Sequence, residues 1–139
     1  MPDRSFDCIV FNDVLEHLAD PQSALGAARG SLTAIGSVIA SVPNVRHFTV
    51  TVPLVLYGRW TYRDRGILDR THLRFFTRSS LIGLFDASGY LVDRVEAIRL
   101  TRRKGKVARV LHLLGHRATE FLAEQYVISA MPRAPSPSR

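Results

Sequence analysis

A short apolar strand that ends in a polar cluster constrains this sequence most strongly. Residues 6–12 read FDCIVFN, a largely apolar, partly β-branched run that predicts a strand buried on both faces. Four polar side chains follow within six residues: Asn12, Asp13, Glu16 and His17. Ligands of open α/β sheets bind outside the carboxyl ends of the strands, so this segment predicts one edge of a binding site.

The residues that follow predict a strand–helix–strand unit. Asp20 is a good N-cap and Pro21 a good first helical residue, so a helix is expected from there to Leu32. Gly36 is expected to close the turn, and a second strand is expected over residues 37–42. Strands joined through a helix pair in parallel with a right-handed crossover, which indicates the α/β class.

The rest of the chain predicts two more strands. Residues 48–57 are apolar with Pro53 in their middle, and either a helix interrupted or started near that proline or a segment lining the sheet fits them. Thr77 is the expected N-cap of a helix that ends before Gly89. Strands are expected over residues 90–100 and 125–131.

One domain is expected over residues 1–131, followed by a disordered Pro- and Ser-rich tail over residues 132–139. A short amphipathic helix is expected over residues 107–114, and a further helical turn over residues 118–123. The single cysteine, Cys8, is interpreted as a small buried hydrophobe. It excludes a disulfide framework and gives a structural zinc site no cysteine pair, so no metal site is expected.

Hydropathy favours a cytoplasmic protein. The sequence contains no run of about 18 apolar residues, so no membrane partner is expected. Its first residues, MPDRSFD, lack the apolar core of a signal peptide.

Three blocks of the sequence resemble one known family. They read FDCIVFNDVLEHLADPQSAL, GSVIASVPN and DRTHLRFFTRSSLIGLFDASGY, and they resemble class I S-adenosylmethionine-dependent methyltransferases in the order of that family. The closest likeness is to the branch of small-molecule enzymes that includes those of ubiquinone and methionine biosynthesis. The resemblance implies a partial Rossmann-like sheet of about four strands with flanking helices. Two or three strands would be parallel, and the last would insert antiparallel between the second and third strands of this chain.

The glycine-rich half of that family has no counterpart in these residues. No G-x-G-x-G occurs in the 139 residues, so the chain resembles the carboxyl half of a methyltransferase domain. The resemblance implies weak or no S-adenosylmethionine binding by this half alone, and it leaves open whether the half is active. The first strand would then have an open edge, through which self-association is expected.

The resemblance also implies a cofactor wall at the end of the first strand. Asn12, Asp13 and Val14 would line the methionine end of the cofactor. His17 faces the same opening, where it would position the cofactor or act as a general base, because histidine titrates near neutral pH. The alternative is a structural role, in which Glu16 and His17 cap the turn and hydrogen-bond the neighbouring loop.

The acceptor would be a small molecule bound by two further segments. By resemblance, Asp69, His72 and Arg74 approach the opening, where His72 would orient the substrate or act as a base and Arg74 would pair with an anionic group. The alternative is a salt-bridged turn in which Asp69 holds Arg70 or Arg74. Two further residues follow the expected second strand directly, where substrates commonly enter: Asn44 and Arg46.

The basic composition motivates an alternative function. The net charge is +7, and arginine supplies 17 of the 19 basic residues. One true cluster, residues 102–106, would suit a non-enzymatic methyltransferase remnant that binds nucleic acid or protein. Nucleic acid is the less favoured partner, because the aromatic residues do not alternate with basic ones in a stacking pattern.

Overall fold

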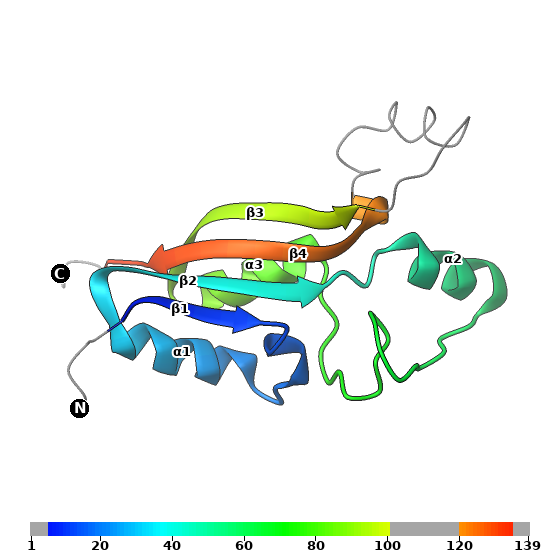
Figure 1. Cartoon of the computed structure of the whole chain (residues 1–139), viewed down its shortest axis with the longest axis horizontal. Helices are drawn as coiled ribbons and strands as arrows, with labels where there is room; N and C mark the ends of the chain where they lie inside the picture. Colours follow the sequence, from blue (N-terminus) through cyan, green and yellow to red (C-terminus); the bar gives the residue numbers. More distant parts are fainter. Residues whose placement is uncertain (1–5, 101–119, 135–139) are drawn as a thin grey trace, which may run out of the picture.

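The computed structural model describes residues 6–100 and 120–134 (Figure 1). Along the described residues the labelled elements run in the order β1 (Phe6–Asn12), η1 (Leu15–His17), α1 (Pro21–Ser31), β2 (Leu32–Pro43), α2 (Phe48–Tyr57), α3 (Arg78–Ala87), β3 (Tyr90–Leu100) and β4 (Ala123–Pro132). The basic cluster, the helix expected over residues 107–114 and residues 135–139 of the expected tail lie outside the described residues.

The four strands form one mixed sheet in the order β1-β2-β4-β3. β1 pairs in parallel with β2, and β4 pairs antiparallel with both β2 and β3. β1, β2 and β3 therefore run in one direction, with β4 inserted antiparallel between the last two. The α/β class and the position expected for the last strand are confirmed.

Local sequence signals fix both helices that pack on the sheet. The Asp20 carboxylate accepts from the Ser23 amide at 3.0 Å, and Pro21 opens α1 as expected. The Thr77 hydroxyl and the Ser80 side chain cap α3 reciprocally. After α3, Gly89 turns the chain with a φ of 80°, a conformation that glycine adopts without strain.

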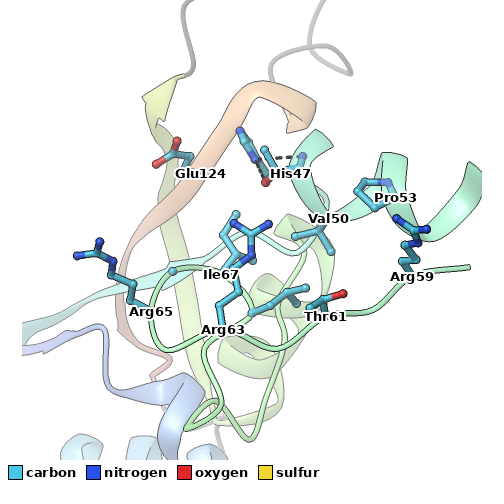
Figure 2. Close-up of a pocket in the computed structure, with 12 residues that line it drawn as sticks. His47, Val50, Pro53, Arg59, Thr61, Arg63, Arg65, Ile67 and Glu124 are labelled. Atoms are coloured by element: carbon cyan, nitrogen blue, oxygen red, sulfur yellow. Dashed lines mark hydrogen bonds between the residues drawn. The ribbon is translucent and has the colours of Figure 1, made fainter. Parts of the chain in front are cut away.

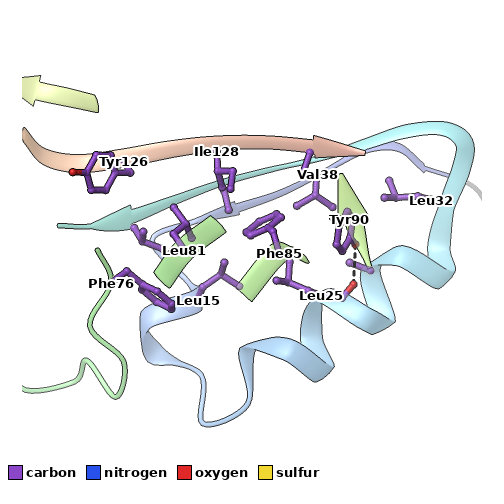
Figure 3. Packing of buried hydrophobic residues seen from close by; sticks show 14 of the residues in the cluster. Leu15, Leu25, Leu32, Val38, Phe76, Leu81, Phe85, Tyr90, Tyr126 and Ile128 are labelled. Carbon is purple, nitrogen blue, oxygen red and sulfur yellow. Dashed lines mark hydrogen bonds between the residues drawn. The ribbon is translucent and has the colours of Figure 1, made fainter. Parts of the chain in front are cut away.

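The core lies between one face of the sheet and the helices α1 and α3 (Figure 3). Leu25 of α1, Phe85 of α3 and Ile128 of β4 are each fully buried. The opposite face carries exposed apolar side chains, including Val10 and Met131. No described helix covers that face, so the described part of the fold has two layers, the sheet and the helices on one side of it (Figure 1).

Three expectations, about β1, Cys8 and the turn before β2, were wrong. β1 is an edge strand of the described sheet, and most of its side chains are exposed rather than buried on both faces. Cys8 is therefore an exposed thiol and not a core residue. β2 begins at Leu32 and contains Gly36, where a Cβ atom would lie 3.0 Å from the Phe6 carbonyl oxygen. Glycine permits that close approach of β1 to β2.

Residues 48–57 form a helix with Pro53 inside it, which settles the alternatives that the sequence left open. The proline stands in the sixth position of this ten-residue helix. α2 packs few of its side chains, and Val55 is 79% exposed. The helix and the loop after it stand beyond the carboxyl end of β2 (Figure 1). No helix of the described residues is long and apolar enough to cross a membrane.

Removing the hydroxyl groups of two buried tyrosines is expected to change the free energy of unfolding in opposite directions. The Tyr90 hydroxyl donates to the Leu25 carbonyl oxygen at 2.8 Å, whereas the Tyr126 hydroxyl has no hydrogen-bond partner among the described residues. Tyr90→Phe is expected to lower the free energy of unfolding by about 1 kcal/mol, and Tyr126→Phe to raise it by up to about 1 kcal/mol. Urea unfolding at neutral pH measures both; equal effects of the two variants would contradict the burial of an unpaired hydroxyl.

The same tyrosines predict a loss of stability in alkali. Burial raises the pKa of Tyr90 and of Tyr126 from 10.0 to about 12. The folded state therefore holds protons that the unfolded state has lost, and stability falls as pH rises from about 10 towards 12. Unfolding of the Tyr90→Phe, Tyr126→Phe double variant across that range is expected to show a shallower loss than the wild-type chain.

Candidate functional site

The turn after β1 is held in a conformation that aims polar groups at the sheet edge. Asp13 has a φ of 52°, in the left-handed region that aspartate tolerates better than most residues. Its amide group donates to the Ser41 carbonyl oxygen at 3.2 Å and to the Ser41 hydroxyl at 3.0 Å. β2 thereby fixes where the chain leaves β1.

Four side chains meet at this edge, and two of them were not predicted. The Ser41 hydroxyl lies 2.7 Å from the Asn12 Oδ1 and 3.1 Å from the Asp13 Oδ1, and the Gln125 amide donates to the same Asp13 oxygen. Ser41 and Gln125 are buried. A signal for Gln125 existed: an antiparallel last strand begins at the edge where the parallel strands end. We call Asn12, Asp13, Ser41 and Gln125 the edge cluster.

The structure brings together the two histidines that the sequence singled out. The rings of His17 and His72 meet edge to face with centroids 4.7 Å apart. Nδ1 of His17 lies 3.2 Å from the Thr71 carbonyl oxygen, and Nδ1 of His72 lies 3.0 Å from the Ile67 carbonyl oxygen. A carbonyl oxygen can only accept, so each Nδ1 is the donor, and in the neutral tautomer with that donor the lone pair is on Nε2.

Glu16 joins the histidines from the core side. Its carbonyl oxygen accepts from the amides of Leu73 and Arg74 at 2.7 and 3.0 Å, which ties the 3₁₀ turn to the segment that carries His72. Its side chain is 1% exposed, and both carboxylate oxygens lack a hydrogen-bond partner among the described residues. Burial raises the pKa of this carboxyl group and the charge of Asp13 adds to the effect, whereas the Glu16 backbone and the neighbouring His17 oppose it. One donor atom each from Glu16, His17 and His72 lie within 4.8 Å of one another.

Asp69 and Arg74 both form hydrogen bonds within the chain, Asp69 to a neighbouring residue and Arg74 to a distant one. Asp69 accepts from the amide and the hydroxyl of Thr71 at 2.8 and 2.7 Å, and these bonds lower the pKa of its carboxyl group. Arg74 donates to the Ala19 carbonyl oxygen, and Arg70 pairs with Asp64 at 3.0 Å. The bonds of Asp69 and Arg70 stabilise the turn that precedes His72. Among the described ion pairs, Asp69 is paired with neither Arg70 nor Arg74, the two partners that the sequence suggested.

Asn44 and Arg46 connect β2 to the segment before β4. Asn44 is fully buried; its amide nitrogen donates to the carbonyl oxygens of Glu120 and Ala123 at 2.6 and 2.8 Å, and its Oδ1 accepts from the Arg46 amide at 2.9 Å. The Arg46 guanidinium pairs with the Glu120 carboxylate and lies over the Phe121 ring. Both side chains are therefore engaged within the chain.

A cavity of about 440 Å³ opens between α2 and the loop that follows it (Figure 2). Three arginines that the sequence did not single out line it, Arg59, Arg63 and Arg65. His47 and Glu124 lie on its other wall, and Glu124 directly precedes Gln125 of the edge cluster. The cavity is thus adjacent to the carboxyl edge of the sheet, and cations predominate among the charged residues that line it.

Comparison with known families and structures gives one family and many similar folds. The sequence profile described as "Methyltransferase domain" matches residues 1–95. A search of curated protein sequences finds no match. A methyltransferase from Archaeoglobus fulgidus, described as S-adenosylmethionine-dependent, superposes with a TM-score of 0.61 at 14% identity, over 94% of this chain and 61% of that one.

Two further structures have the same fold and different descriptions. The Burkholderia thailandensis 1,6-didemethyltoxoflavin-N1-methyltransferase, solved with its acceptor and S-adenosylhomocysteine, gives a TM-score of 0.58 at 13% identity, over 96% of this chain and 47% of that one. The cyclase SpnF gives 0.58 at 14% identity, over 97% of this chain and 53% of that one. The chain spans about half to three fifths of these relatives, and likeness at such identities establishes the fold alone.

Proposed function

This chain belongs to the methyltransferase domain family, and from that premise we propose that it supplies the acceptor-side half of an S-adenosylmethionine-dependent small-molecule methyltransferase. The family profile covers most of the chain, and one structural relative was solved with S-adenosylhomocysteine bound. The proposal includes weak or no cofactor binding by these 139 residues alone, because they contain no G-x-G-x-G. Without the cofactor contacts of a glycine-rich half, the methyltransferase activity of these residues is expected to be low or absent.

The observation that carries the proposal is the edge cluster. It lies at the carboxyl ends of the parallel strands β1 and β2, where ligands of open α/β sheets bind. Asn12 and Val14 are exposed beside the half-buried Asp13, so this turn can offer backbone and side-chain groups to a ligand. We assign Asn12, Asp13 and Val14 to the methionine end of the cofactor, with His17 beside them.

In methyl transfer the main task of the protein is to align the acceptor atom with the methyl group of the cofactor. S-adenosylmethionine supplies a methyl group that its sulfonium charge already activates. The chain must hold the acceptor in line with that group, and it must remove a proton only when the acceptor is a hydroxyl or an amine. His17 and His72 are the candidates for that step, because Nδ1 of each faces a carbonyl oxygen and Nε2 keeps its lone pair.

The arginine-lined cavity favours an acceptor with an anionic group. Arg59, Arg63 and Arg65 outnumber the single carboxylate of Glu124 in its lining. Guanidinium groups bind carboxylates and phosphates through paired hydrogen bonds. An anionic small molecule held there would lie beside the carboxyl edge of the sheet, where the transferred methyl group is expected. The four residues assigned to the substrate from sequence do not line this cavity, and their proposed part is to hold the segments next to it: Asn44, Arg46, Asp69 and Arg74.

Calorimetric titration of the 139-residue chain with S-adenosylhomocysteine tests the half-cleft proposal. We expect millimolar affinity or no detectable heat, because the cofactor would contact one wall only. Micromolar affinity for this chain by itself would contradict the proposal. The DNA directly upstream of the first codon provides an independent test: an encoded glycine-rich strand–turn–helix, in frame or frameshifted, would supply the other wall.

Self-association through β1 is the expected behaviour of the isolated chain. β1 has one neighbour among the described strands, and Val10 on it is 60% exposed. An uncovered strand edge with apolar side chains pairs readily with another copy, and a lysine there opposes pairing. We expect dimers or larger species by light scattering at high concentration, and a shift towards monomer in Val10→Lys. Val55→Lys, on the exposed helix α2, is the matched control. A monomeric wild-type chain at high concentration, or dissociation in Val55→Lys but not in Val10→Lys, would contradict self-association through β1.

A further inference from the structure

We propose that Glu16, His17 and His72 form a binding site for one divalent transition-metal ion. The site lies where the 3₁₀ turn after β1 meets the segment before α3. Its three side chains bring a carboxylate and two imidazoles together from positions 16, 17 and 72 of the chain. The inference goes beyond methyl transfer and can be tested without the cofactor.

The buried carboxylate of Glu16 is the first observation that points to a ligand. A carboxyl group that is 1% exposed and accepts no hydrogen bond from a described residue carries a large desolvation cost. Buried carboxylates are ordinarily paired with a cation or coordinate a metal. No arginine or lysine is paired with Glu16 among the ion pairs of the described residues. A metal ion beside the two histidines would supply the missing partner.

The histidines are oriented as metal-binding histidines ordinarily are. In such sites the ring nitrogen that does not bind the ion donates to a carbonyl or carboxylate oxygen, which fixes the tautomer. Nδ1 of His17 and Nδ1 of His72 both face backbone carbonyl oxygens, those of Thr71 and Ile67. The Nε2 atoms are left as the coordinating nitrogens, and two rings 4.7 Å apart are placed to share one ion.

Only a small adjustment separates the present positions from coordination. One donor atom of each residue, a ring nitrogen or a carboxylate oxygen, lies within 4.8 Å of those of the other two. Ligands bound at about 2.0–2.2 Å lie at most about 4 Å apart around one ion. His17 is exposed and His72 is half-buried, so modest rotations of their rings close the difference while Glu16 stays fixed in the core.

The donor set selects the class of ion. Two imidazoles and one carboxylate suit Zn²⁺, Co²⁺ or Fe²⁺, whereas Mg²⁺ and Ca²⁺ prefer oxygen ligands throughout. Three protein ligands leave positions open for a water molecule or an oxygen or nitrogen of a bound small molecule. An ion there would occupy the Nε2 lone pairs, so His17 and His72 would orient and polarise an acceptor through it instead of removing its proton directly.

Titration of the metal-free 139-residue chain, without a polyhistidine tag, tests the site. Co²⁺ is followed by its visible absorption and Zn²⁺ by calorimetry, with Mg²⁺ as the contrasting ion. We expect one Co²⁺ or Zn²⁺ per chain and no competition from Mg²⁺ at equal concentration. Glu16→Gln and His72→Asn should each weaken binding by more than about 100-fold, because loss of a residue that merely supports a metal ligand already costs about 10–100-fold.

Two further variants keep the test decisive. His17→Asn changes an exposed side chain, so it removes a ligand without altering the core if Glu16→Gln disturbs folding. Asp64→Asn removes a carboxylate that is 92% exposed and should leave the affinity unchanged. No uptake of Co²⁺ or Zn²⁺ by the folded wild-type chain, tighter binding of Mg²⁺, or full affinity in folded His17→Asn and His72→Asn would each overturn the proposal.

Discussion

Phe85→Ala is expected to lower the free energy of unfolding by about 3–5 kcal/mol. The Phe85 ring is fully buried, and its centroid lies 5.6 Å from that of Tyr90 (Figure 3). α3 rests on the sheet largely through Phe85 and Leu81, since these are its buried hydrophobic side chains. Alanine would leave a cavity that the surrounding sheet fills only partially. Small domains are stable by about 5–15 kcal/mol, so this variant approaches the unfolding threshold.

Urea unfolding at neutral pH measures this loss. Val55→Ala is the matched control, because it shortens a side chain that is 79% exposed on α2 and should change stability by less than about 0.5 kcal/mol. Equal losses in the two variants would contradict a core centred between α3 and the sheet. The m-value should stay unchanged in both, since neither substitution alters how much surface unfolding exposes.

Asn44→Ala is expected to cost about 1–3 kcal/mol of stability, because it leaves buried polar groups without partners. The Asn44 side chain satisfies the carbonyl oxygens of Glu120 and Ala123 and accepts from the Arg46 amide. Those bonds hold the start of β4, and with it Gln125 of the edge cluster. Asn44→Ala should therefore also disturb the edge cluster at the proposed cofactor site, in addition to lowering the stability of the fold.

The alternative for Asn44 is the direct substrate contact expected from its sequence position. That role predicts unchanged stability on Asn44→Ala and a change in acceptor binding alone. Asn12→Ala is the matched control, since Asn12 is exposed and the Ser41 hydroxyl can still bond Asp13. Its effect on unfolding should stay below about 1 kcal/mol. A stable Asn44→Ala chain would restore the substrate assignment.

Local signals in the sequence predicted the framework well. The N-caps Asp20 and Thr77 and the turn at Gly89 depend on interactions within a few residues, so the sequence carries them directly. The parallel pairing of β1 with β2 follows from the helix between them. The antiparallel insertion of β4 came from the resemblance to the methyltransferase family and not from any local pattern.

Features that depend on distant neighbours escaped prediction. The apolar run around Cys8 fits a buried strand, but burial is decided by what covers a strand, and no described element covers the outer side of β1. Ser41 enters the edge cluster only through the register of β1 on β2. The arginines at 59, 63 and 65 stand in a loop with no periodicity, so nothing in the sequence indicated that they line one cavity.

The histidine cluster falls between these cases. The sequence singles out both His17 and His72, yet they stand 55 positions apart, and hydrogen bonds between their two segments, including those from the Leu73 and Arg74 amides to the Glu16 carbonyl oxygen, bring them together. Glu16 was read as a possible cap because its burial is not visible in sequence. The sequence predicts no metal site because it lacks a cysteine pair, whereas the site proposed at Glu16, His17 and His72 uses a carboxylate and two imidazoles.

The central claim is that the turn after β1 forms a wall of an S-adenosylmethionine site. Amide NMR spectra of the ¹⁵N-labelled chain, recorded while S-adenosylhomocysteine is added to millimolar concentration, detect binding too weak for calorimetry. We expect shifts concentrated at four residues, Asn12, Asp13, Val14 and His17, with a dissociation constant in the millimolar range. Unshifted amides at this turn, or shifts confined to another part of the sheet, would contradict it.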